Sequence, residues 1–267
     1  MDFLTLFILL LVGCVIGFLA GFFGVGGGVI LVPVLVFLFE HQSVNNSVLT
    51  QLAMGTSLFI VIFASISSAT KHTQQQNVYW RAVMIMGIAS VITAGLGSVI
   101  AASLPGNVLR IFFAVVVFAV GLRLFFEKIK QDQIGKFKPD TWKLILIGSV
   151  VGVLSSLTGV GGGVFSIPLM YYLANFPIKR AIGTSSATII ITAGVAVTGY
   201  ILNGYGNPGL PAHTFGFVDY FQAIPLIIGT VAIGPLGAVT AHKIRSLILR
   251  RLFAVFLTAN ALYMFFK

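Results

Sequence analysis

One glycine-rich motif occurs twice in this chain, and no other feature restricts its fold as much. The sequence Gly-Val-Gly-Gly-Gly begins at Gly24 and again at Gly159, and an apolar run with one proline, Pro33 or Pro168, follows each copy. Motif and proline recur at the same distance, since 159 − 24 and 168 − 33 are both 135. The chain is therefore expected to fold as two similar halves.

The duplication continues well beyond the glycine motif. Ala-Met-Gly-Thr-Ser at 53–57 returns as Ala-Ile-Gly-Thr-Ser at 181–185, and residues 97–126 align without gaps with residues 237–266. The spacing between equivalent residues drifts along the chain, so the loops differ in length while the elements persist. We divide the chain into a first membrane repeat (1–127), a charged cytoplasmic linker (128–141) and a second membrane repeat (142–267).

The composition restricts the class of protein to one. Hydrophobic residues make up 58% of the chain and charged residues only 8%, with a mean hydropathy of +1.05. A soluble domain carries roughly 25% charged residues, and a β-barrel would show alternating polarity, which is absent here. The fold class predicted is all-α: a polytopic membrane protein with two inverted repeats, about eight full transmembrane helices and two glycine-broken half-helices. The apolar segments lie at 4–21, 29–39, 47–69, 82–103, 108–126, 142–157, 164–173, 181–202, 221–241 and 247–266.

The distribution of charge orients these segments. The net charge is +10, but the basic residues lie in alternate short loops, which is the positive-inside pattern of a membrane protein and not a nucleic-acid surface. This places the basic loops in the cytoplasm and both termini outside, with the two halves inverted, in a multi-pass protein of the cell (inner) membrane. The cytoplasmic basic residues are Lys71, Arg81, Lys128, Lys130, Lys136, Lys138, Lys143, Lys179, Arg180, Lys243, Arg245, Arg250 and Arg251.

The two glycine motifs are the first candidate binding elements. Glycine runs let successive backbone N–H groups converge on an anion, and a helix that starts just beyond adds the positive end of its dipole. The alternative is close packing of helices through small residues, but two motifs in register favour a site. The candidate substrate-binding glycines are Gly24, Gly26, Gly27 and Gly28 in the first half, and Gly159, Gly161, Gly162 and Gly163 in the second.

The repeated Gly-Thr-Ser triplets are the second candidate. The hydroxyls of Thr56 and Ser57, and those of Thr184 and Ser185, can donate to an anion, although such hydroxyls also bond between membrane helices. Arg110 and its equivalent Arg250 could pair with an oxyanion, or extend toward lipid headgroups at helix ends, which we favour.

Several chemistries lack the residues they need. No Asp or Glu lies in the middle of an apolar segment, so an intramembrane carboxylate relay has no candidate. The sequence has no metalloprotease, serine-hydrolase or ATP-binding motif, and its single cysteine, Cys14, excludes an internal disulfide. We expect neither an enzyme nor a metal or other cofactor.

The run from Leu19 to Pro33, its second copy from Leu154 to Pro168, and the segment 181–185 resemble the sulfite exporter TauE/SafE family over essentially the whole chain. The resemblance implies an inner-membrane secondary transporter for a small sulfur-containing or organic anion, such as sulfite, thiosulfate or sulfoacetate. Export is the direction implied, with alternating access produced by one half rocking against the other. The expected partners are the anion and the lipid bilayer; a coupling proton stays open.

Two other classes of function are compatible with the sequence. One is an anion-selective channel, in which flux would not saturate. The other is a membrane scaffold without transport, in which the glycine turns would serve packing alone. A cation transporter is a lesser variant, because no intramembrane carboxylate is present to attract the ion.

Overall fold

The computed structural model describes residues 3–23, 26–126, 139–243 and 246–266, and these residues form ten α-helices. The described part contains no β-strand, only an isolated bridge between Thr214 and Asp219. The five helices of the first half are α1 (Phe3–Phe23), α2 (Gly28–His41), α3 (Asn46–Gln74), α4 (Trp80–Ser103) and α5 (Gly106–Phe126). Those of the second half are α6 (Thr141–Thr158), α7 (Gly163–Leu173), α8 (Ile178–Gly204), α9 (Tyr220–Lys243) and α10 (Ser246–Phe266).

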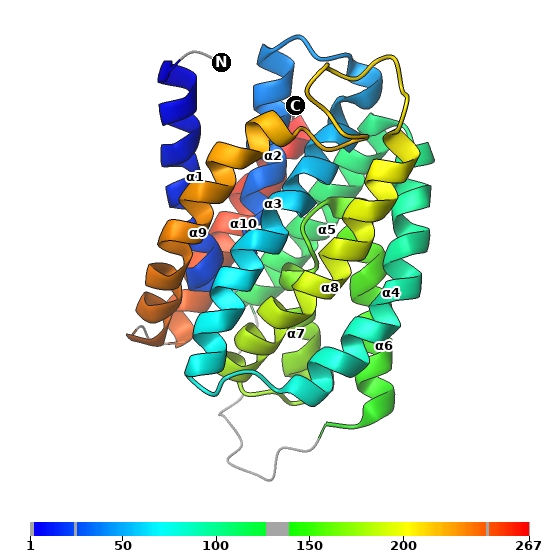
Figure 1. Cartoon of the computed structure of the whole chain (residues 1–267). Helices are drawn as coiled ribbons and strands as arrows, with labels where there is room; N and C mark the ends of the chain where they lie inside the picture. Colours follow the sequence, from blue (N-terminus) through cyan, green and yellow to red (C-terminus); the bar gives the residue numbers. More distant parts are fainter. Residues whose placement is uncertain (1–2, 24–25, 127–138, 244–245, 267) are drawn as a thin grey trace.

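The path of the chain confirms the predicted inversion. In Figure 1, α1 descends from the upper end and α2 returns to that end, whereas α6 ascends from the lower end and α7 returns downward. Three long helices then cross the bundle in each half, so α1 begins and α10 ends at the same end (Figure 1). Residues 128–138 of the predicted linker lie outside the described part of the chain, and the proposed domain division stays a prediction.

Most of the long helices suit a bilayer. Among the described residues, seven helices are long and apolar enough to cross a membrane, namely α1, α3, α4, α5, α6, α8 and α9. The eighth predicted span corresponds to α10, whose described apolar stretch, Ala254–Phe265, is shorter. Large apolar side chains such as Ile88, Ile92 and Leu96 point outward from α4, with Ile92 70% exposed. Such a surface suits hydrocarbon and not water, so the chain is a polytopic helical membrane protein.

The two halves are interlocked. Helix α1 packs along α9, and its repeat equivalent α6 packs along α4, so both pairs join one half to the other. Helices α3 and α8, which are equivalent to each other, also pack together, as do α5 and α10. The molecule is therefore built around an approximate two-fold relationship, with equivalent contacts on both sides of it.

Small residues make the paired helices fit closely. A methyl group added at Gly17 of α1 would lie 2.5 Å from the Cα atom of Thr230 in α9. The equivalent Gly152 of α6 meets α4, where an added methyl group would lie 2.9 Å from the carbonyl oxygen of Ser90. Small residues that let helix backbones approach are the usual basis of helix association in membranes.

Candidate functional site

Each half contains one glycine turn, between α1 and α2 or between α6 and α7. Gly26 and Gly27 have positive φ angles of 73° and 82°, and their equivalents Gly161 and Gly162 have φ angles of 84° and 91°. This left-handed conformation is strained for any residue with a side chain, which explains why glycine is needed here. Gly24 lies outside the described residues.

The two glycine turns lie against each other. A methyl group added at Gly28 would come within 2.5 Å of the Cα atom of Val160 in the other turn. Methyl groups at Gly26 and Gly161 would both approach Val61 and Ile189, at 2.9 and 3.6 Å for Gly26 and at 2.6 and 3.1 Å for Gly161. Thus both turns border on the same two side chains.

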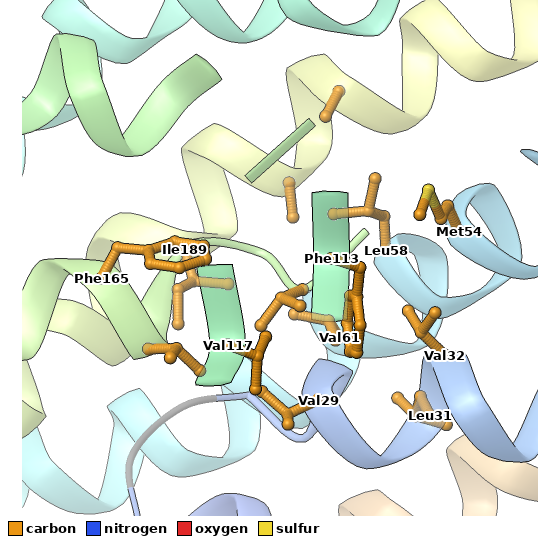
Figure 2. Close-up of a cluster of buried hydrophobic side chains, with 14 of the residues drawn as sticks. Val29, Leu31, Val32, Met54, Leu58, Val61, Phe113, Val117, Phe165 and Ile189 are labelled. Atoms are coloured by element: carbon orange, nitrogen blue, oxygen red, sulfur yellow. The ribbon is translucent and has the colours of Figure 1, made fainter. Parts of the chain in front are cut away.

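These two side chains place the turns deep inside the bundle. Val61 and Ile189 are equivalent by the repeat and lie near the middles of α3 and α8. Both are buried, and Figure 2 shows them in a cluster of apolar side chains that also includes Val29, Phe113 and Phe165. Irregular backbone at such depth is tolerated only when it is surrounded by protein or lines a polar cavity.

The helices that follow the turns begin without a side-chain cap. Gly27 is the N-cap residue of α2 and Gly162 that of α7, and neither can offer a side-chain acceptor. The Gly162 carbonyl accepts from the N–H groups of Phe165 and Ser166, at 3.1 and 2.9 Å. The first N–H groups of a helix have no partner within the helix, so two positively polarised helix starts meet near the centre.

The Gly-Thr-Ser triplets join the halves. Oγ1 of Thr56 in α3 accepts the N–H of Asp219 at the start of α9, over 2.9 Å. Oγ1 of Thr184 in α8 likewise accepts the N–H of Tyr79 before α4, over 3.0 Å. An added methyl group at Gly55 would clash with the carbonyl oxygen of Phe217 in the segment before α9. Gly55 thus allows the segment before α9 to approach α3, and Thr56 holds that segment by a hydrogen bond.

The serines of the triplets lie closer to the glycine turns. The Ser57 hydroxyl donates to the Gly159 carbonyl over 2.8 Å, which ties α3 to the second turn. The Ser185 hydroxyl lies 2.6 Å from that of Ser166, three residues into α7 after Gly163. All four predicted Thr and Ser residues are fully buried. The serines therefore bond to the second glycine turn and to α7, whereas the threonines bond to the segments that precede α9 and α4.

The predicted arginines do not join this group. Arg110 lies in the first turns of α5 and is partly exposed, with a buried Nε atom that has no hydrogen-bond partner. The side chain of Arg250 lies outside the described part. No group of three His, Cys, Asp or Glu side chains able to hold a metal occurs among the described residues.

Asp219 is a feature that sequence reasoning did not single out. It lies at the predicted outer end of α9, yet its side chain is only 4% exposed. Its Oδ1 atom accepts the N–H groups of Phe221 and Gln222, both at 3.0 Å, and so caps α9. Burial raises the pKa of the Asp219 carboxyl, while those two N–H groups and nearby His213 act in the opposite direction. A loop position next to aromatic residues gave no signal of this burial.

The comparisons with known proteins agree on one family. The family model of the sulfite exporter TauE/SafE matches residues 9–264. A probable membrane transporter protein of Haemophilus influenzae is 31% identical over 97% of both chains, and one of Methanocaldococcus jannaschii is 30% identical over 98% of this chain and 97% of its own length. Another from Bacillus subtilis is 27% identical over 90% of this chain and 89% of its own.

No solved structure matches the chain. The descriptions of the family and of these relatives name membrane transporters and no enzyme. The many apolar helices agree with a multi-pass protein of the cell membrane. With a family model that covers nearly all of its residues, the chain belongs to the sulfite exporter TauE/SafE family of membrane transporters.

Proposed function

We propose that this transporter moves a small sulfur-containing or organic anion, such as sulfite, thiosulfate or sulfoacetate, and holds it at the paired glycine turns. The observation that carries the proposal is that both turns contact the same two side chains: Gly26 and Gly161 each lie against Val61 and Ile189. Two helix starts that meet near the middle of the bundle offer N–H groups to one ligand. The name of the matching family supports the choice of sulfite as the first anion to test.

The surroundings of the turns suit an anion that must be released again. The side chains around Val61 are apolar, so a few backbone N–H groups would act with little competition from water. An anion held in this way is not bound by a buried arginine or lysine. Its departure therefore breaks hydrogen bonds, and no buried ion pair has to be separated.

Any alternating-access movement must be compatible with the helix packing that joins the two halves. The packing of α1 on α9 and of α4 on α6 couples each half to the other along its length. Rocking of one sequence half against the other would break both interfaces. We therefore propose that each of these pairs moves as a unit around α3 and α8, which hold the side chains between the turns.

Uptake into proteoliposomes tests the proposal. Purified protein is reconstituted and offered sulfite, thiosulfate, sulfate, sulfoacetate and taurine, with and without a pH gradient. We expect saturable flux of one or a few sulfur anions, and loss of that flux in Gly26→Leu and Gly161→Leu proteins that still insert. A response to the pH gradient would identify a coupling proton.

The same assay separates the other functions. Flux that rises without saturation, together with electrical conductance, would indicate a channel. No flux of any anion from folded protein, together with stoichiometric capture of a partner, would support the scaffold. Unchanged flux in both leucine variants would reject the turns as the site, whatever the anion.

A further inference from the structure

Two buried hydroxyl groups beside the glycine turns have no hydrogen-bond partner. Ser65 of α3 lies one helical turn beyond Val61 and is fully buried, with an unpartnered Oγ atom. That Oγ atom would lie 2.9 Å from a methyl group added at Gly26, so it faces the first turn directly. It is near Val61, which both turns contact.

Ser155 stands in a similar relation to the second turn. It is fully buried in α6, and its Oγ atom also has no hydrogen-bond partner. Its Cβ atom would lie 3.4 Å from a methyl group added at Gly162, the N-cap residue of α7. Its main-chain carbonyl accepts the N–H of Gly159 over 2.9 Å, which fixes the serine next to the turn.

Neighbouring hydroxyls show that partners are ordinarily found in this bundle. Ser156 donates to the carbonyl of Ala94 over 2.8 Å, and Ser186 donates to that of Ile182 over 3.1 Å. Serine in a membrane helix commonly bonds to the carbonyl four residues earlier, as Ser186 does. A buried hydroxyl without a partner is unfavourable, so two of them beside the turns require an explanation.

The repeat shows that the fold does not need either hydroxyl. The position equivalent to Ser65 is Ala193, and the position equivalent to Ser155 is Ala20. Both alanines are buried, and Ala20 lies against Gly27 as Ser155 lies against Gly162. The equivalent position in the other half thus packs a methyl group in place of each hydroxymethyl group.

We infer that Ser65 and Ser155 donate hydrogen bonds to the transported anion, one beside each glycine turn. This inference rests on the proposed function and extends it. It defines the ligand as a small oxyanion with at least two accepting oxygens. Ser65 lies in α3 and Ser155 in α6, and these two helices are not equivalent by the repeat. The two hydroxyls therefore break the two-fold symmetry of the turns and would contact different parts of a bound anion.

The test compares three alanine variants in the proteoliposome assay. Ser65→Ala and Ser155→Ala should raise the half-saturating concentration of sulfite or thiosulfate about tenfold each, which is the size of effect expected for a hydrogen bond to a charged group. Their thermal unfolding temperature should stay the same or rise, because an unpaired hydroxyl has been removed. Ser68→Ala is the matched control, since the Ser68 hydroxyl already lies 3.3 Å from that of Ser186; its half-saturating concentration should not change.

Thermal unfolding with added anion gives a second readout. Sulfite or thiosulfate should raise the unfolding temperature of the natural protein and of Ser68→Ala, but much less that of the Ser65→Ala/Ser155→Ala double variant. Unchanged half-saturation in both single variants, with flux still lost in Gly161→Leu, would overturn this inference and leave the site at the turns. Absence of both flux and thermal shift in the natural protein would overturn the inference together with the proposed function.

Discussion

Thr56 and Asp219 link the two halves of the transporter through one hydrogen bond, in which the threonine hydroxyl oxygen accepts the aspartate N–H over 2.9 Å. Thr184 and Tyr79 form the equivalent bond on the other side of the two-fold arrangement. A residue that the sequence marked for ligand binding thus also holds the start of a helix from the opposite half.

Replacement of this threonine should weaken the fold. Thr56→Val keeps the shape but removes the acceptor and leaves a buried N–H without a partner, which costs about 1–3 kcal/mol. We expect a lower unfolding temperature for Thr56→Val and for Thr184→Val, measured in detergent. Thr56→Ser should retain most of the stability. If Thr56→Val unfolds at the natural temperature while its half-saturating concentration rises, the threonine acts mainly on the substrate.

Asp219 should make stability depend on pH. Burial raises the pKa of its carboxyl, so the folded protein holds more protons than the unfolded chain between the ordinary and the raised pKa. Stability should therefore fall as the pH rises through that interval, and nearby His213, which lowers the pKa of the Asp219 carboxyl, opposes the effect. Asp219→Asn keeps an oxygen that can cap α9, and this part of the pH dependence should disappear. Equal pH dependence in both proteins would assign it to other groups.

The interface between α1 and α9 should tolerate no added bulk at Gly17. A side chain there meets the backbone of Thr230, and overpacking of this kind costs roughly 1–3 kcal/mol. We expect Gly17→Val to lower the unfolding temperature and the yield of folded protein. The control is Gly194→Ala, because the added methyl group meets nothing within 4 Å, and it should leave the unfolding temperature and the yield unchanged. Gly194→Val is unsuited as a control, because the side chain of valine restricts its conformation in a helix. A stable Gly17→Val protein would mean that the two helices can separate.

The position of Val61 can be examined by labelling. In a Cys14→Ser background, Val61→Cys should react with a small water-soluble thiol reagent when the transporter opens, and the transported anion should slow that reaction. Tyr205→Cys, at a position 73% exposed beyond the end of α8, should react at the same rate with or without the anion. Equal slowing at both positions, or none at Val61→Cys, would place the ligand elsewhere.

The repeat, the inversion and the boundaries of most helices could be predicted from the sequence, because glycine motifs, apolar length and charge bias are local signals. The short apolar runs after the glycines are indeed the short helices α2 and α7. The pairing of α1 with α9 could not be predicted from Gly17, because a small residue does not specify which helix approaches it.

Only part of the candidate site could be predicted from the sequence. The glycine turns were marked by their composition, but Val61 and Ile189 look like any apolar residues until α3 and α8 bring them between the turns. Ser65 and Ser155 gave no signal either, since their missing partners are a property of the packed bundle. The role of the threonines depends on contacts made more than a hundred residues away.

The central claim is that the anion binds at the glycine turns, and a comparison of anion flux in two glycine variants tests it most directly. A methyl group at Gly161, where φ is 84°, would lie 2.6 Å from a methyl carbon of Val61, whereas one at Gly194 meets nothing within 4 Å. In folded, reconstituted protein, Gly161→Ala should lose most of its saturable sulfite or thiosulfate flux and Gly194→Ala should retain it. Equal and natural flux in both variants would contradict the assignment of the anion site to the glycine turns.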